Sequence, residues 1–283
     1  MSIEMPEATI LAAQMRAELT GKTVTGFELC GCESLQRIGF VNKDSAAFAR
    51  LTGGTVENVA SRGNTMVVKL TGEQNLILSP EYGGEILFQK NERSLPARYH
   101  LRLDLADGSA LTVRLTGMGG IYASCEAGLG DHYLVRRDFD PDRPEPLDAA
   151  LTAEAFAGAL AQATRQLKSV LVGKDAIVVG LSNAAFQDVI YRAGLHPKRR
   201  ASDLSPDAQR ALYDAMRLVA TERLRLGGKV HFRDLYGRPG SYEPAMGPAF
   251  KGRPCPACGT PIQTLAHGGG HVFVCPRCQP APA

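Results

Sequence analysis

The stretch that decides the fold lies near the end of the chain: Cys255-Pro-Ala-Cys258, sixteen further residues, and then Cys275-Pro-Arg-Cys278. Each Cys-x-x-Cys turn can direct two thiolates at one ion, and a hairpin between the turns closes a tetrahedron of sulfur ligands. The segment between them suits a hairpin, because β-branched residues flank a glycine-rich turn at His267-Gly-Gly-Gly270. Two disulfides or four buried thiols are the alternatives. The spacing favours a closed structural site for one Zn²⁺, which leaves no open position for a substrate.

Length and composition indicate an ordinary globular protein. At 283 residues the chain is long enough for two domains, or for one domain and a small metal-bound module. No apolar run has the length of a membrane span, and the start lacks the pattern of a signal peptide. Seven cysteines leave an odd number outside the zinc site, which favours a reducing compartment. We therefore expect a cytoplasmic protein without a membrane partner.

The net charge of +3 is too small to predict a nucleic-acid partner by itself. The basic residues are nevertheless concentrated in the second half of the chain, which is compatible with a surface that faces phosphates. A solvated helical face is the alternative. The basic positions are 198–200, Arg217, Arg223, Arg225, Lys229, Arg233, Arg238, Lys251 and Arg253.

The first half of the chain predicts one helix followed by antiparallel strands. Residues 6–19 carry apolar side chains at helical spacing, and Pro6 suits a first turn. From Lys22 to about Ser124 the apolar pattern changes to period two with turns between the runs, which is typical of a β-sandwich or barrel. The predicted strands are 23–29, 65–70, 75–78, 85–88, 100–105 and, after an Asp107-Gly108 turn, 110–115.

The second half is predicted to be helical. Residues 138–146 contain three prolines and four acidic residues with almost nothing to bury, so they mark a domain boundary. Helices are expected at about 152–164, with Thr152 as cap, and at 166–172, 183–193 and 206–225. The fold class is therefore α+β.

Two motifs in this half resemble the formamidopyrimidine-DNA glycosylase / endonuclease VIII family. The run from Gly180-Leu-Ser-Asn183 to His196-Pro197 resembles the helix–two-turn–helix signature of that family, and the four-cysteine segment resembles its zinc hairpin. Pro6-Glu7 and the stretch from Gly227-Gly228 to Arg233-Asp234 extend the resemblance over the chain. It implies an N-terminal helix and antiparallel β-sandwich domain (1–137), a linker (138–148), a helix–two-turn–helix domain (149–246) and a zinc hairpin (247–283).

The resemblance implies that double-stranded, damaged DNA is the partner. Members of the family clamp a duplex and flip a damaged base into a pocket. A monomer is expected, associated with the bacterial nucleoid. Asn183 follows a glycine-flanked turn that can offer N–H groups and its amide to phosphate, with a plain helix N-cap as the alternative. The DNA-binding positions implied are Asn183, Arg62, His100, Tyr82, Met118 and Arg233.

Catalysis in the family depends on an N-terminal proline followed by a glutamate. The proline amine, with a pKa of roughly 8, attacks C1′ of the sugar and forms a Schiff base. Aligning Pro6-Glu7 on the family's second Pro-Glu pair places Glu4 on the catalytic glutamate and Ile3 on the proline. Glu4 is then the expected acid/base, with a surface carboxylate as the alternative. The attacking group would be the amine of Ser2, exposed when Met1 is removed, or an activated water.

Other positions depart from the family pattern as well. Gly270 stands where the zinc hairpin usually carries an arginine, and Asn64 stands where a lysine is expected. Tyr82 and Met118 replace the usual residues that fill the gap left by the flipped base. Two hypotheses follow: a DNA-repair glycosylase, with or without AP lyase activity, or a non-catalytic module that binds damaged DNA.

Overall fold

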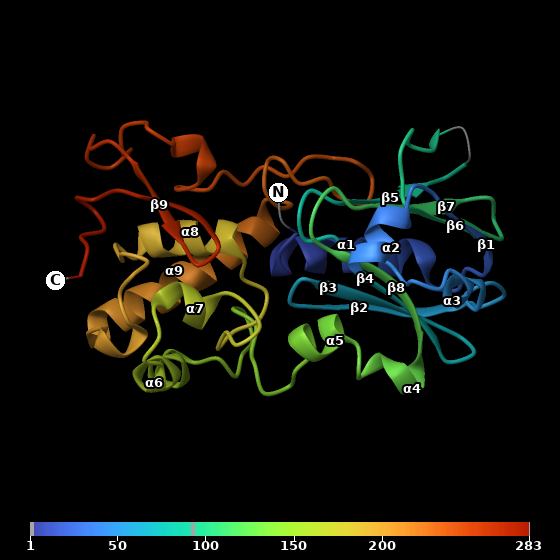
Figure 1. The fold of residues 1–283 in the computed structure, drawn as a ribbon, viewed down its shortest axis with the longest axis horizontal. Coiled ribbons are helices and arrows are strands. Elements are labelled where there is room, and N and C mark those ends of the chain that lie inside the picture. The colour runs from blue at the N-terminus through green and yellow to red at the C-terminus, as the bar shows by residue number, and fades with distance from the viewer. Residues whose placement is uncertain (1–2, 92–93, 283) are drawn as a thin grey trace. The chain divides into compact units, whose positions relative to one another are not determined.

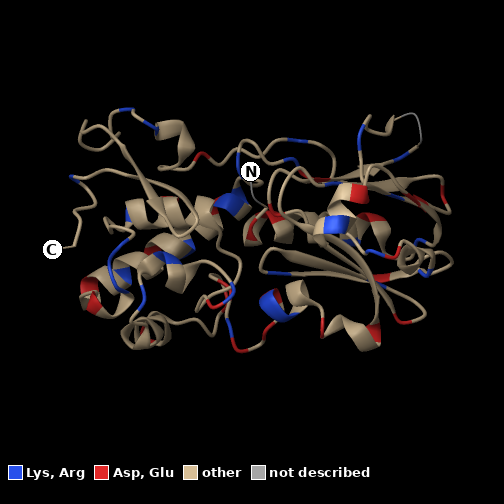
Figure 2. Ribbon diagram, viewed as in Figure 1, with Lys and Arg blue, Asp and Glu red and all other residues tan. Residues whose placement is uncertain are grey.

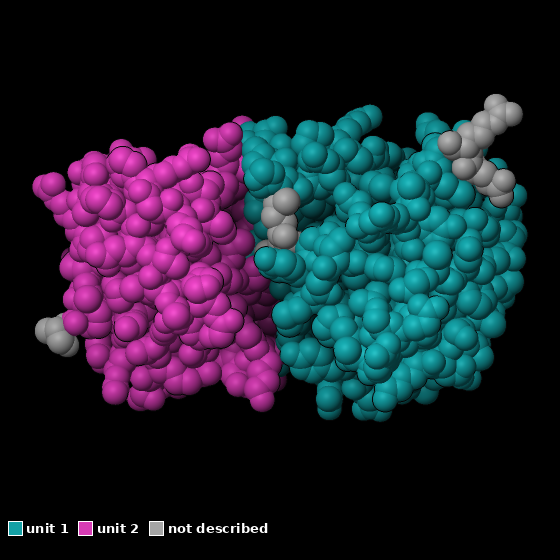
Figure 3. Space-filling view, turned by 45° about the horizontal axis from the view of Figure 1, so that its top comes forward, with its two compact units in different colours: residues 1–140, 226–241 teal, residues 141–225, 242–283 magenta. Residues whose placement is uncertain are grey.

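The computed structural model describes residues 3–91 and 94–282 (Figure 1). Its internal contacts divide the chain into two units (Figure 3). Unit 1 comprises residues 1–140 and 226–241, and unit 2 comprises residues 141–225 and 242–283. The functional boundaries at 137, 148 and 246 remain predictions.

Unit 1 contains an antiparallel β-sandwich. In its described residues, one four-stranded sheet has the order β1 (Val24–Leu29), β6 (Leu101–Leu105), β7 (Ala110–Arg114), β5 (Glu85–Gln89). The other has the order β2 (Val56–Arg62), β3 (Thr65–Leu70), β4 (Gln74–Ser79), β8 (Gly120–Cys125). Along β6, buried leucines alternate with partly exposed charged residues, because successive side chains point to opposite faces of a sheet. The predicted α+β class with a sandwich is confirmed.

The predicted N-terminal helix is confirmed as α1 (Met5–Leu19). Leu11, Met15 and Leu19 lie on its buried face within the core of the sandwich. The helix begins with a capping box, in which the side chains of Glu4 and Glu7 accept hydrogen bonds from each other's backbone N–H groups. This geometry fixes the direction of both carboxylates at the start of the helix.

Several elements of unit 1 were absent from the sequence-based prediction. These are strands β2 and β8 and the short helices α2 (Glu33–Ile38), α3 (Ala46–Ala49), α4 (Glu126–Leu129) and α5 (Tyr133–Asp138). β2 carries polar residues at successive positions, Glu57 and Asn58, and its pairing with β3 shifts register there, so no simple alternation is visible.

The segment 226–241 belongs to unit 1 although it follows the last long helix of unit 2. Phe232 and Leu235 are buried in the core of the sandwich. The side chain of Gln14 on α1 donates to Asp234 at 3.0 Å and accepts from the Leu235 N–H at 2.9 Å. These bonds hold the returning segment against the first helix.

Unit 2 is helical, as predicted. It contains α6 (Ala153–Gln162), α7 (Leu167–Leu171), α8 (Asn183–Arg192), α9 (Pro206–Arg225) and two short 3₁₀ turns (Ala201–Asp203 and Pro248–Phe250), and it ends in the hairpin of β9 (Gln263–His267) and β10 (Gly270–Val274). The Thr152 hydroxyl accepts from the Ala155 N–H at 3.1 Å, which confirms the predicted cap. Among the described residues, no helix is long and apolar enough to cross a bilayer.

The turn between β2 and β3 is closed by a buried carboxylate. Asp138, at the end of α5, accepts from the Asn64 N–H at 3.1 Å, from the Thr65 hydroxyl at 2.6 Å and from Arg137 at 2.7 Å. A Cβ on Gly63 would lie 2.7 Å from the Asp138 carboxyl carbon, so only glycine fits there. Asn64 is therefore a buried part of the framework.

We predict that Asp138→Ala lowers the free energy of unfolding by about 2–4 kcal/mol, because it leaves the buried Asn64 N–H and Thr65 hydroxyl without their acceptor and removes one of the two carboxylates paired with Arg137. Urea denaturation followed by circular dichroism measures this change. Asp131→Ala, at an exposed position of the same segment, serves as the control and should change stability by less than about 0.5 kcal/mol. Equal stability of the two variants would contradict the role assigned to Asp138.

Candidate functional site

The four predicted zinc ligands are brought together in unit 2. The sulfur atoms of Cys255, Cys258, Cys275 and Cys278 all lie within 4.8 Å of one another. The Cys258–Cys275 and Cys255–Cys278 distances are 3.4 and 3.8 Å, too long for disulfides, whose S–S bond is about 2.05 Å. A Zn–S bond of about 2.3 Å gives a tetrahedron with edges of about 3.8 Å. The cluster therefore fits a tetrahedral Zn²⁺ and excludes the disulfide alternative.

Neighbouring polar groups orient the thiols. Gln279, fully buried, accepts from the Cys275 N–H at 3.0 Å and donates to the Leu195 carbonyl at 2.8 Å. Hydrogen bonds from Thr260 lower the pKa of the Cys258 thiol to about 6, which favours the thiolate that binds metal. The second knuckle is in this way tied to the loop that follows α8.

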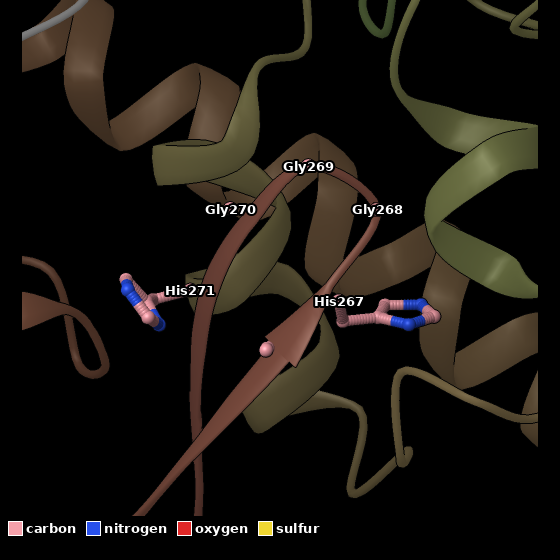
Figure 4. A pocket seen from close by; sticks show the side chains of 6 residues that line it. His267, Gly268, Gly269, Gly270 and His271 are labelled. Carbon is pink, nitrogen blue, oxygen red and sulfur yellow. The ribbon is translucent and has the colours of Figure 1, made fainter.

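The tip of the zinc hairpin has no arginine. Residues 266–271 line a shallow pocket, and the side chains of His267 and His271 point away from each other on its two sides (Figure 4). Lys168 of α7 reaches the tip, where its ammonium group donates to the His267 carbonyl at 2.6 Å. Burial and then the charge of Lys168 hold the pKa of His267 below its usual range, so this histidine is neutral near pH 7.

Asn183 lies at the start of α8, beside the hairpin. Its amide nitrogen donates to the His271 carbonyl at 3.0 Å, and its buried side-chain oxygen has no hydrogen-bond partner among the described residues. The N-cap of the helix is Ser182, which accepts from the Ala184 N–H, so the alternative that made Asn183 the cap is wrong. The helix N-terminus and the hairpin form one continuous surface of unit 2.

Tyr82 and Met118 come from different loops of unit 1 and lie side by side. Their side chains are 61% and 64% exposed, and the Tyr82 N–H donates to the Met118 carbonyl at 2.9 Å. The Thr116 hydroxyl donates to the Tyr82 carbonyl at 3.1 Å. A Cβ on Gly117 would lie 2.8 Å from the Tyr82 ring, so the close approach requires glycine. Two large apolar side chains are thus presented together to solvent.

The other predicted DNA-binding residues have mixed environments. Arg62 is half-buried at the end of β2, and Arg233 is exposed. His100 accepts from the Leu115 N–H at 2.9 Å, so one of its ring nitrogens serves the sandwich itself. Burial and then the charge of Arg114 hold the pKa of His100 below its usual range. His100 is therefore uncharged near pH 7 and offers a single ring nitrogen to any ligand.

Glu4 is fully buried, so the alternative of a surface carboxylate is wrong. Its partner is Lys229, whose ammonium nitrogen lies 2.9 Å from the Glu4 carboxylate and 3.9 Å from that of Glu7. The sequence placed Lys229 among the basic residues of a phosphate-facing or solvated surface, and its burial against Glu4 was not predicted. Ser2 lies outside the described residues.

A small cavity lies beside this ion pair. It has a volume of about 110 Å³, and its lining includes Ile3, Gly84, Lys229, His231 and Arg233. The lining therefore combines the apolar residue Ile3 with the ion-paired Lys229 and with two exposed basic residues, His231 and Arg233. Gly83, the residue that follows Tyr82 in the chain, also lines the cavity.

Three family models match the chain in the expected order. The formamidopyrimidine-DNA glycosylase N-terminal domain matches residues 3–116, its H2TH domain matches residues 143–233, and the zinc finger found in FPG and IleRS matches residues 252–281. The chain belongs to the formamidopyrimidine-DNA glycosylase family. The formamidopyrimidine-DNA glycosylase of Bacillus cereus is 26% identical over 98% of this chain and 99% of its own length. That of Heliobacterium modesticaldum is 29% identical over 98% of this chain and 99% of its own length.

Solved structures share the fold of this family member. The MutM (Fpg) protein of Thermus thermophilus aligns with a TM-score of 0.80 and 24% identity, covering 99% of this chain and all of its own. The Fpg of Lactococcus lactis, in a complex with DNA that contains an abasic site, aligns with a TM-score of 0.82 and 20% identity, covering 98% of this chain and all of its own.

We predict that Cys258→Ser, or treatment with a zinc chelator, releases the metal and unfolds the hairpin, because metal binding supplies much of the folding energy of such a module. Zinc content by mass spectrometry should fall, and the amides of β10 should lose protection from hydrogen exchange while those of β3 and β4 keep it. Cys125→Ser is the matched control, since Cys125 lies outside the cluster. Unchanged zinc content in Cys258→Ser would contradict the assignment.

Proposed function

We propose that this protein is a base-excision DNA glycosylase that binds damaged duplex DNA, with or without AP lyase activity. The observation that carries the proposal is in unit 1: Gly83, which directly follows the exposed Tyr82, lines the same cavity as Lys229, the ion-pair partner of the buried Glu4. The names of the relatives support it, as does the Lactococcus lactis structure with abasic-site DNA.

Unit 2 would supply phosphate contacts. The positive end of the α8 helix dipole favours an anion, and Asn183 adds a side-chain amide. Both units carry basic residues (Figure 2). Those exposed in unit 2 near the zinc module and after α8 are Lys198, Arg200, Lys251, Arg253 and Arg277. The module would hold one Zn²⁺ in a structural role, and the protein would act as a monomer in the bacterial cytoplasm, at the nucleoid.

The chemistry would take place at the cavity of unit 1. Tyr82 and Met118 would fill the gap left when the damaged nucleotide leaves the stack, a step that costs a few kcal/mol. Glu4 would act as the general acid/base. The candidates that the sequence offers for the attack on C1′ are the amine of Ser2 and water, because Ile3 has only a hydrocarbon side chain. Arg62, His100 and Arg233 would contact the DNA.

A non-catalytic module that recognises damaged DNA is the second candidate. It is favoured by Ile3 at the position expected for the nucleophile and by the ion pair that already neutralises Glu4. Such a protein would still insert Tyr82 and Met118 as a wedge between the bases and would keep the phosphate contacts, but it would release no base.

The enzyme hypothesis predicts that Glu4→Gln lowers the rate of base release by about 100-fold, because the general acid/base is removed while the shape is kept. Single-turnover assays on duplexes with oxidised purines, oxidised pyrimidines or abasic sites measure this rate. Glu57→Gln, at an exposed carboxylate, is the control and should keep the full rate. Specific binding to damaged duplex without release of any base by the wild-type protein would favour the second candidate.

The wedge hypothesis predicts that replacing Tyr82 and Met118 together by alanine weakens binding to damaged duplex by about tenfold or more, because stacking on an exposed base contributes about 1–3 kcal/mol. Fluorescence anisotropy measures affinity, and 2-aminopurine beside the lesion reports unstacking. Ile38→Ala removes an apolar side chain of similar exposure (61%) and should leave both readouts unchanged. Normal unstacking by the double variant would rule out the wedge.

A further inference from the structure

We propose that Lys229 supplies the nucleophile at this site: its amine attacks C1′ of the damaged nucleotide and forms the Schiff base in place of an N-terminal amine. The inference rests on the proposed glycosylase function and assigns the reacting atom within it.

Lys229 is the amine that the described part of the cavity offers. Its side chain is 9% exposed, and Lys229 and Ile3 are both among the residues that line the cavity. Ile3 cannot attack, because its side chain is hydrocarbon and its backbone nitrogen is an amide. The ammonium nitrogen of Lys229 lies 2.9 Å from Glu4, so a proton acceptor is already within hydrogen-bond distance of the reacting atom. Lysine is the residue that most often forms Schiff bases in enzymes.

The backbone around Lys229 is held firmly, which a positioned nucleophile requires. Gly227 and Gly228 adopt left-handed conformations, with φ of 69° and 90°, and a Cβ on Gly240 would lie 2.1 Å from the Gly228 carbonyl oxygen. The Lys229 N–H donates to Glu7 at 3.3 Å, and its carbonyl accepts from the Phe232 N–H at 2.8 Å. The loop is thus locked to the first turn of α1.

Stability alone does not account for this lysine. Removing an ammonium and a carboxylate from water costs several kcal/mol for each ion, and well-packed apolar residues are commonly as stable or more stable than a buried ion pair. A lysine needed only for neutralising Glu4 and Glu7 would have no reason to reach a cavity wall. Lys229 does so, beside the exposed His231 and Arg233, which are suited to contact the flanking phosphates.

The proton balance of the reaction closes with these groups. Glu4 takes a proton from the Lys229 ammonium, and the neutral amine bonds to C1′ while the C1′–N bond to the base breaks. The amine gives up a second proton to the departing base, and Glu4 returns its proton to O4′ as the C1′–O4′ bond opens. The products are a protonated imine between Lys229 and C1′, the sugar 4′-hydroxyl and the free base. At an existing abasic site, the aldehyde oxygen leaves as water instead.

The test is borohydride trapping of the full-length wild-type protein on a duplex with one abasic site, followed by proteolysis and mass spectrometry of the cross-linked peptide. Hydride reduces the imine to a stable secondary amine. We expect the adduct on Lys229, and an N-terminal extension that blocks the amine of Ser2 should leave the trapped fraction unchanged. An adduct on Ser2 or on another lysine would overturn the inference, whatever the behaviour of any variant.

Lys229→Arg keeps the positive charge beside Glu4 and Glu7 but has no accessible neutral amine, so the trapped fraction should fall about 100-fold or more. Lys22→Arg, at another ion-paired lysine of unit 1, should trap as the wild type does. Urea denaturation shows whether each variant is folded.

Different results would reject the role of Lys229 and the glycosylase function. Base release by the wild-type protein without any trapped adduct would reject Lys229 as nucleophile and indicate attack by water, while the glycosylase function stands. Neither binding to damaged duplex nor base release from any lesion would reject both.

Discussion

The buried ion pair between Glu4 and Lys229 is the interaction on which the candidate site of unit 1 depends. It joins the first turn of α1 to a residue 225 positions later in the chain. Because each charge would cost several kcal/mol if buried alone, neither residue can be placed there without the other. The pair therefore fixes the returning segment 226–241 against the first helix, and that segment completes the core with Phe232 and Leu235 and the cavity with Lys229 and Arg233.

In unit 2, metal ligands hold the last segment of the chain in place, as the ion pair does in unit 1. A hairpin of about thirty residues has too little apolar surface to hold its own shape, so a cross-link must substitute for a core. The four sulfur atoms provide it, and two side-chain amides join the hairpin to α8: Gln187 accepts from the Phe273 N–H, and Asn183 donates to the His271 carbonyl. The start of α8 and the hairpin are thus positioned together.

The sequence predicted the helices and strands whose signals lie within a few neighbouring residues. Period-two runs gave six strands, and caps and helical spacing gave α1, α6 and α9, because these signals lie within a few residues. β2 was missed, since its register shift hides the alternation. The zinc ligands were predicted from spacing alone. Lys229 could not be, because its importance comes from a contact with Glu4 that only the folded chain creates. For the same reason the burial of Glu4 and of Asn64 was not foreseen.

The departures from the family pattern have a common physical character. Asn64 and Gly270 stand in two turns where the family pattern has cations, and Asn64 is buried, with its backbone N–H donating to Asp138. Unit 1 also contains a cluster of charges that is deeply buried, at Glu4, Glu7 and Lys229. Apolar replacements of such a cluster are often neutral or stabilising by about 1–4 kcal/mol, so folding alone does not require it. A buried amine, a carboxylate within hydrogen-bond distance and a cavity beside them are together what covalent catalysis on a sugar requires. Chemistry therefore explains this cluster better than stability does.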